Sequence, residues 1–191
     1  MGLCLHRKER RLLSYKGHDG IDRELEVTRV FEDIRLSPSD ELIEFMLALF
    51  GSGRQVWFMG QEDKELTREY LEQVKTHIAL FGAGMFYFRD PETKQLMGYF
   101  RYDAYLYSDN AVVPHFLAFP ALDKDLPQVV LAFFEHLKEL GIKTLIGFTC
   151  AKFYHVLRLF KFLGHEEITR LEKAFQFRNK LYDTVVTKRV L

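Results

Sequence analysis

Cysteine is scarce in this sequence, which has only Cys4 and Cys150 among its 191 residues. Two cysteines cannot build the disulfide framework of a small secreted scaffold, so a reducing environment is the default. Long apolar runs are also lacking, and Leu3–Leu5 is too short for the apolar part of a signal peptide. We therefore expect a cytoplasmic protein that has no membrane span.

The sequence also lacks a net charge, because its 27 basic residues are matched by 27 acidic ones. Proteins dedicated to nucleic acid usually carry a basic excess, so this class is disfavoured for the body of the chain. Residues 1–17 differ from the rest, since their charged side chains are those of Arg7, Lys8, Arg10, Arg11 and Lys16 against Glu9 alone. This basic stretch is either a solvated terminus or a segment that docks on an acidic partner, a membrane surface or nucleic acid.

Hydrophobic and aromatic residues, in contrast, are plentiful in the sequence. Hydrophobic residues make up 48% of the chain and aromatic residues 15%, with 18 Phe, which is enough for a packed core and argues against disorder. The length fits one domain with an arm, so we predict a basic arm over residues 1–23 and a single domain over residues 24–191. The aromatic surplus indicates either a bulky core or a protein interface.

The first half of the chain predicts one strand and two helices. Residues 24–36 are strand-like, and residues 40–50 show apolar side chains at helical spacing after residue types that begin helices. A second helix is predicted over about 62–80, and Gly82 and Gly84 are expected to end it.

The second half alternates strands with helices. The predicted strands are 85–90, 96–107, 111–119, 142–150, 165–178 and 181–190, and the predicted helices are 126–140 and 151–163. Pro114 lies inside one strand and, because proline has no N–H, it indicates an edge, a bulge or a splay. The order predicts an α/β fold of the α+β kind, with a central mixed β-sheet and helices on both faces.

Four stretches in the second half carry a family resemblance through their order and spacing. They are QLMGYF at 95–100, HFLAFP at 115–120, HLKELGIKTL at 136–145 and RLFKFLGHEEITR at 158–170. Together they resemble the GNAT (GCN5-related N-acetyltransferase) superfamily, which implies a GNAT-like fold and acetyl transfer from acetyl-CoA to an amine. Residues 155–170 also resemble GNAT-like proteins of tailed bacteriophages, which implies the cytoplasm of a host cell.

The resemblance implies that the cofactor diphosphate would lie on the loop over residues 120–128. Such loops are rich in glycine, because backbone N–H groups at a helix N-terminus bind anions at close range. This loop has no glycine, carries Asp123 and Asp125, and loses an N–H donor at Pro127. If the cofactor is retained, the implied binding residues are Phe116, Leu117, Phe119, Lys124, Asp125 and Leu126. The alternative is that these residues only begin a helix, so that the acyl-CoA site is degenerate and no cofactor binds.

Candidate catalytic residues come from the same resemblance. The family often uses a Tyr in the helix after its fifth strand to protonate the departing thiolate, and Phe160, which has no transferable proton, stands at that position. If the chain is active, Tyr154 would replace that acid and His115 would act as the base. The alternative for His115 is a structural role, and Cys150 is expected to be buried. No residues have the spacing of metal ligands, so no metal is predicted.

Two functions remain open on this reasoning. The first is a GNAT-like pseudoenzyme that binds a protein partner without acyl transfer. The second is an active N-acetyltransferase with a divergent cofactor loop. Nucleic acid is expected as a partner only for the basic residues 1–17.

Overall fold

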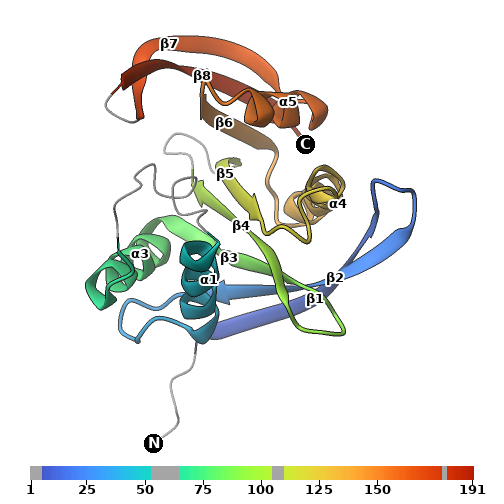
Figure 1. Cartoon of the computed structure of the whole chain (residues 1–191), viewed down its shortest axis with the longest axis vertical. Helices are drawn as coiled ribbons and strands as arrows, with labels where there is room; N and C mark the ends of the chain where they lie inside the picture. The colour runs from blue at the N-terminus through green and yellow to red at the C-terminus, as the bar shows by residue number, and fades with distance from the viewer. Residues whose placement is uncertain (1–5, 53–64, 105–109, 178–179) are drawn as a thin grey trace, which may run out of the picture. The chain divides into compact units, whose positions relative to one another are not determined.

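The computed structural model describes residues 6–52, 65–104, 110–177 and 180–191, without the side chains of residues 81–83. The described elements follow the chain from blue to red in Figure 1. They are β1 (Arg7–Lys16), β2 (Asp22–Phe31), α1 (Asp40–Gly51), α3 (Arg68–Phe81), β3 (Gly82–Arg89), β4 (Leu96–Ala104), β5 (Ala111–Ala118), α4 (Leu126–Glu139), β6 (Thr144–Cys150), α5 (Tyr154–Phe162), β7 (Glu166–Phe177) and β8 (Lys180–Val190).

The strands follow the order β1-β2-β3-β4-β5-β6-β8-β7. Strand β3 pairs antiparallel with β2 and β4, and β8 pairs antiparallel with β6 and β7. Strands β5 and β6 are parallel and are joined through α4, as a parallel pair requires a crossover connection. The predicted mixed α+β sheet is therefore confirmed.

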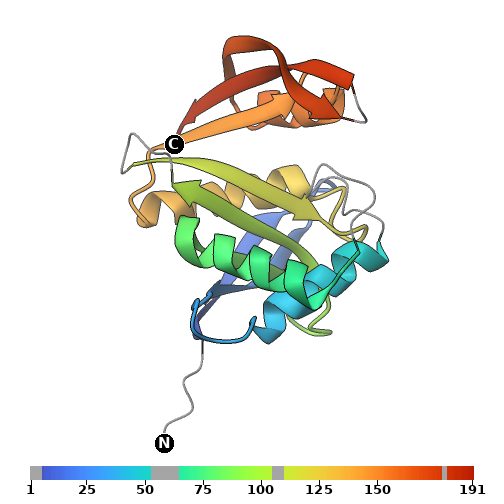
Figure 2. The same cartoon turned by 90° about the vertical axis from the view of Figure 1, so that its left-hand side faces the viewer.

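The chain divides into two compact units, and strand β5 contributes to both. The first unit comprises Met1–Leu13, Glu24–Asp103 and His115–Asp123. Its core forms where α1 and α3 pack on one face of β2, β3 and β4, as Figure 2 shows. Ser39 begins α1 because its hydroxyl accepts the N–H of Leu42 while it donates to the buried Glu32 carboxylate.

The second unit comprises Ser14–Arg23, Ala104–Pro114 and Lys124–Leu191. Helix α4 buries one stripe of large apolar side chains, formed by Val129, Val130, Phe133, Phe134 and Leu137. Strands β6 and β8 pair in unbroken register from Thr144↔Val190 to Cys150↔Thr184. Strand β7 is almost wholly exposed and is interrupted by irregularities between Glu167 and Thr169 and between Leu171 and Phe175.

Most boundaries fall within a few residues of the predicted ones, but three differ for physical reasons. Helix α3 ends at Phe81, directly before Gly82, as predicted, but β3 begins at Gly82 and not at residue 85. Its register shifts between Gly82 and Met85, and Gly84 has a φ of 96°. The strand expected to reach residue 36 ends at Phe31, because Glu32 turns inward to Ser39.

The third difference concerns the basic stretch. Residues 7–16 form strand β1, at one end of the strand order, and residues 14–23 belong to the second unit. The predicted helix over 62–80 begins at Arg68, and residues 62–64 lie outside the described part of the chain. Residues 105–107 of the predicted strand over 96–107 also lie outside it.

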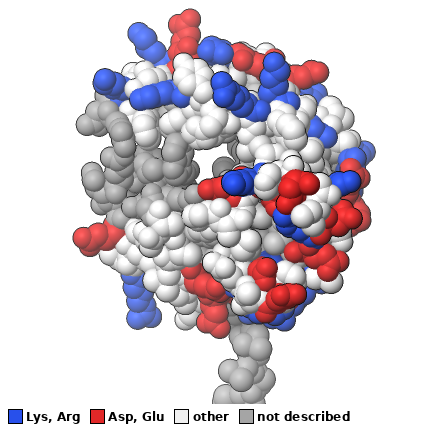
Figure 3. Space-filling model, turned by 45° about the vertical axis from the view of Figure 1, so that its right-hand side comes forward, with Lys and Arg blue, Asp and Glu red and all other residues white. Residues whose placement is uncertain are grey.

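Charge is mixed on the surface. In Figure 3, the Lys and Arg side chains are interspersed with Asp and Glu, and no broad field of one sign covers the described residues of that face. Among the helices that the structure describes, none combines the length and the apolar character needed to cross a bilayer.

Candidate functional site

Strand β5 changes its surroundings at Pro114. Before the proline, Ala111 and Val112 pair with Thr144 and Leu145 of β6. Pro114 has no N–H to donate, and from His115 onward the strand belongs to the first unit. The parallel ladder between described residues is therefore short, which agrees with the edge, bulge or splay that Pro114 indicates.

The far half of β5 lies very close to β4. The N–H of Phe119 donates to the carbonyl of Met97 at 2.8 Å. A Cβ placed on Gly98 would lie 2.7 Å from the carbonyl oxygen of Leu117, so only glycine fits there. Because backbone groups alternate along a strand, Leu117 and Phe119 turn toward β4, whereas Phe116 and Ala118 turn their N–H and C=O groups to the other side.

His115 and Asp103 form the clearest titratable pair in the first unit. His115 Nε2 lies 3.0 Å from Asp103 Oδ2, and the side chains are 38% and 22% exposed. Arg101 Nη2 donates to the same oxygen at 3.1 Å. A carboxylate accepts hydrogen bonds, so the His115 tautomer has its proton on Nε2 and its lone pair on Nδ1.

Asp103 is held in its ionised form. Burial alone would raise the pKa of Asp103, but the hydrogen bond from His115 and the charge of Arg101 outweigh it and lower that pKa below its ordinary value. An ionised Asp103 fixes the orientation of the imidazole and stabilises its protonated form. The pair is thus built like a general base with its positioning carboxylate.

The loop before α4 contains two successive turns. The N–H of Leu122 donates to the Phe119 carbonyl at 2.8 Å, and that of Asp123 to the Pro120 carbonyl at 3.4 Å. Asp125 then precedes α4 with φ −96° and ψ −4°, and its side chain makes no capping hydrogen bond. Its carboxylate therefore does not satisfy the N–H groups that begin α4.

The Asp125 carboxylate is held instead by the hairpin over residues 14–23, within the second unit. It accepts the N–H of His18 at 3.0 Å and the hydroxyl of Tyr15 at 3.3 Å, and it also contacts His18 Nδ1. Arg23 Nη1 lies 3.5 Å from Asp125 Oδ2, the oxygen that accepts the Tyr15 hydroxyl. Burial opposes the charge, yet these His18 and Arg23 contacts lower the pKa of Asp125, while burial and the nearby carboxylate raise the pKa of Tyr15 to about 12.

Phe160 is a core residue of α5. Its side chain is 6% exposed, and it stacks on His165 with ring centroids 4.8 Å apart. A Cβ on Gly147 of β6 would lie 2.9 Å from the Phe160 ring, so the glycine makes room for it. A ring that fills this position packs the helix against the strand and offers no proton.

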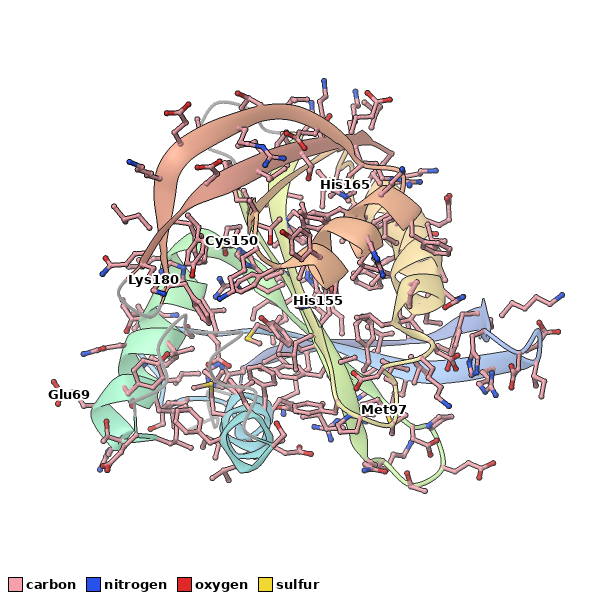
Figure 4. The ribbon with its side chains drawn as sticks, turned by 45° about the horizontal axis from the view of Figure 1, so that its top comes forward. Glu69, Met97, Cys150, His155, His165 and Lys180 are labelled. Atoms are coloured by element: carbon pink, nitrogen blue, oxygen red, sulfur yellow. The ribbon has the colours of Figure 1, made fainter. Side chains whose placement is uncertain are left out.

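The remaining sequence candidates are spread over both units. Tyr154 begins α5 with 71% of its surface exposed, and Cys150, labelled in Figure 4, is buried and free at the end of β6. Lys124, Asp125 and Leu126 surround the start of α4. Phe116, Leu117 and Phe119 lie in the first unit with His115. In the described ranges, no group of His, Cys, Asp and Glu side chains has the arrangement of a metal site.

Sequence reasoning missed two groups of residues that contact the candidates. Asp103 was not singled out, although a carboxylate in a strand of mostly apolar and aromatic residues is a visible signal. Tyr15, His18 and Arg23 gave no signal, because they reach Asp125 from more than a hundred positions away in the chain.

Several solved structures that are similar to this chain are acetyltransferases. No family model and no curated protein matches the chain by sequence. A GNAT-family acetyltransferase from Bacillus anthracis is similar in structure with a TM-score of 0.65 and 11% identity, over 93% of this chain and 98% of that one.

Two further similar structures differ in what they acetylate. An acetyltransferase from Salmonella typhimurium that modifies the N-terminal serine of ribosomal protein L7/L12 has a TM-score of 0.66 and 11% identity, over 87% of this chain and 95% of that one. The spermidine N-acetyltransferase from Vibrio cholerae, in complex with CoA and spermine, has a TM-score of 0.64 and 15% identity, over 81% and 93%. The expected GNAT fold is therefore confirmed.

Proposed function

We propose that this chain, which has the GNAT fold, is an N-acyltransferase that uses acetyl-CoA and carries His115 as its general base. The observation that carries the proposal is the 3.0 Å contact between His115 and Asp103. His115 also lies on the strand where the family resemblance leads us to expect a base. The contact adds a charged partner that a merely packed histidine does not need.

The residues of β5 fit an extended amide ligand. Phe116, Leu117 and Phe119 are the proposed residues along which the amide arm of acyl-CoA would lie, as an extended ligand lies along a strand. When bound, the cofactor would supply an activated thioester. Lys124 and Leu126 at the start of α4 are its proposed diphosphate contacts, and Asp125 opposes them with its charge.

The proposed chemistry at His115 is a proton transfer. The Nδ1 lone pair accepts the proton that an amine loses as its nitrogen bonds to the acyl carbon. Asp103 keeps the ring oriented through Nε2 and stabilises the imidazolium. The side chain is 38% exposed, so an acceptor can approach it from solvent, and the proposed acceptor is a primary amine. Tyr154 remains the proposed acid for the thiolate.

The test is thiol release from acetyl-CoA with a panel of primary amines, including peptides and polyamines. We expect turnover by the native chain and a loss of at least roughly 100-fold in kcat for His115→Gln, the usual scale of general-base catalysis. His136→Gln in α4 is the matched control and should keep full turnover. A folded native chain without turnover on any acceptor would contradict the proposal.

A second candidate function is a GNAT-like pseudoenzyme that binds a protein partner. It is favoured by two observations, the buried Phe160 at the position of the family's acid and the Asp125 carboxylate at the start of α4. Calorimetric titration separates the two candidates. CoA binding together with turnover supports the enzyme, whereas a folded chain that neither binds CoA nor releases thiol supports the binding protein.

A further inference from the structure

The exposed side of helix α5 gathers basic and aromatic side chains. Residues three, four and seven positions apart lie on the same side of a helix, so Tyr154, Arg158 and Phe162 form one row and Lys161 lies beside it. All four are exposed, with exposed fractions of 71% for Tyr154 and 56% for Phe162. His155, labelled in Figure 4, adjoins the row on the same helix. We call Tyr154, Arg158, Lys161 and Phe162 the α5 surface.

The opposite side of α5 is the one that packs on the sheet. Phe160 is buried against Gly147 of β6, and Val156, about one turn earlier, is half-buried on the same side. A helix at the surface of a protein commonly carries charges of both signs on its outer side. Helix α5 has no acidic residue, so its two cations have no partner of opposite charge on their own helix.

The cations of the α5 surface also have no ionic partner on other elements. Among the residues that the structure describes, no carboxylate lies within ion-pair distance of Arg158 or Lys161. In the first unit, by contrast, the guanidinium of Arg89 contacts the carboxylate of Glu44. The α5 surface therefore presents two uncompensated positive charges between two exposed rings, which is complementary to a partner that carries both negative charge and apolar groups.

The sequence around α5 is basic as well. Residues 151–191 contain nine Lys and Arg against four Asp and Glu, whereas residues 1–150 contain 18 against 23. A long polyanion, such as a nucleic acid or an anionic bilayer, would also meet the acidic remainder of the chain, which repels it. A short acidic segment of a protein can be confined to the α5 surface. Exposed Tyr and Phe beside Arg are, in addition, residue types that are enriched at protein interfaces.

We propose that the α5 surface docks a short acidic segment of a partner protein, one in which apolar side chains alternate with carboxylates. The carboxylates pair with Arg158 and Lys161, and the apolar side chains cover the rings of Tyr154 and Phe162. The two kinds of contact reinforce each other, because covering the rings excludes water that would otherwise screen the charges. This docking role goes beyond acyl transfer and does not depend on it.

The test is fluorescence anisotropy of a short labelled peptide, built of Glu interspersed with Leu, titrated with the full chain. The reference probe is the same peptide with Gln in place of every Glu. We expect the acidic peptide to bind at least roughly 5-fold more tightly than the Gln peptide, since two exposed ion pairs are gained. The difference should shrink as salt is added, because salt screens exposed charges.

Matched variants assign the binding to α5. Arg158→Gln should weaken binding of the acidic peptide roughly 2- to 5-fold, and its combination with Lys161→Gln should weaken it further. Phe162→Ala removes an exposed ring and should cost roughly 3- to 10-fold. Arg68→Gln, the same substitution at an exposed position of α3, is the control and should change the affinity by less than about 2-fold. Tyr154 is kept, because it is the proposed acid for the thiolate.

The outcomes separate docking from acyl transfer. Weaker peptide binding by Arg158→Gln and Phe162→Ala, with Arg68→Gln unchanged, supports the inference, and so does the same pattern in a chain that releases no thiol. Equal affinity for the two peptides, or an equal loss with Arg68→Gln, overturns it. Tighter binding of single-stranded oligothymidylate or of phosphatidylserine vesicles than of the acidic peptide also overturns it and assigns the surface to nucleic acid or to a membrane.

Discussion

Two histidines of this chain, His115 and His165, show how surroundings decide what an imidazole can do. His115 in the first unit is partly exposed and bonded to an ionised carboxylate. His165 in the second unit, labelled in Figure 4, is buried, stacks on Phe160 and lies 3.2 Å from the Thr187 hydroxyl. Burial and the charge of Arg189 lower the pKa of His165 to about 4.

The difference teaches that a titratable side chain is not catalytic merely because it can carry a proton. His115 has a charged partner, the Asp103 carboxylate, which fixes the orientation of its ring. His165 has no such partner: its Nε2 is buried and makes no hydrogen bond with any described residue. It is kept neutral and serves packing.

The largest expected effect comes from changing Asp103, the carboxylate partner of His115. Asp103→Asn keeps the shape of the side chain but removes the charge that orients and stabilises His115. We expect kcat to fall by roughly 100-fold while the KM for acetyl-CoA changes little, because Asp103 acts through His115. The pH profile of kcat should also shift. A loss confined to KM would show that Asp103 serves binding instead.

The next prediction compares the stability cost of substituting two glycines, Gly98 beside β5 and Gly147 beside Phe160. Gly98→Ala drives a Cβ against the backbone of β5 and is expected to lower the free energy of unfolding by about 1–3 kcal/mol. Gly147→Ala meets the Thr187 and Phe160 side chains, which have some freedom to shift, so its cost should be smaller. Gly51→Ala, with open space around it, is the control in a urea titration. Equal stability of all three would refute the close β4–β5 contact.

The pH dependence of stability tests the His165 side. Because its folded pKa of about 4 lies below the usual 6.5, the unfolded chain takes up a proton first as the pH falls. The free energy of unfolding is therefore unaffected by His165 above about pH 6.5 and falls as the pH is lowered from about 6.5 to about 4. We expect the total fall to be about 1–2 kcal/mol. His165→Leu should flatten this slope in denaturant titrations at several pH values. An unchanged slope would assign the pH dependence elsewhere.

The smallest expected effect is that of Phe160→Tyr, which places a tyrosine where the family resemblance expects one. Phe160→Tyr adds a hydroxyl to a buried ring, which should cost about 1 kcal/mol unless the hydroxyl finds a partner. Since the ring packs on Gly147 and His165, we expect no gain in turnover. A clear rise in kcat, measured beside a Phe162→Tyr control on the exposed part of α5, would show that the position still serves acyl transfer.

The sequence predicted most of the fold, because apolar spacing and turn residues are local signals. The helix beginning at Leu126 and the strand pair closing the chain follow directly from such signals. The irregular start of β3 at Gly82 and Gly84 could not be predicted, because a glycine after a helix can end the helix and can also begin such a strand.

The candidate site was predictable only in part, for a similar reason. His115 could be named from its strand, but its pairing with Asp103 depends on how β4 and β5 lie side by side. The contacts of Tyr15 and His18 with Asp125 could not be predicted, because both residues lie more than a hundred positions from Asp125 in the sequence. Contacts between distant segments decide what the local residues do.

The irregular course of β7 has a consequence for the behaviour of concentrated solutions. Lys173 takes a φ of 49°, and its N–H donates to the side chain of Asp183. An outermost strand with such kinks and with charged Glu167 and Arg170 offers no straight template for another chain. We therefore expect that β7 does not pair with strands of other molecules to form fibrils, even at high protein concentration.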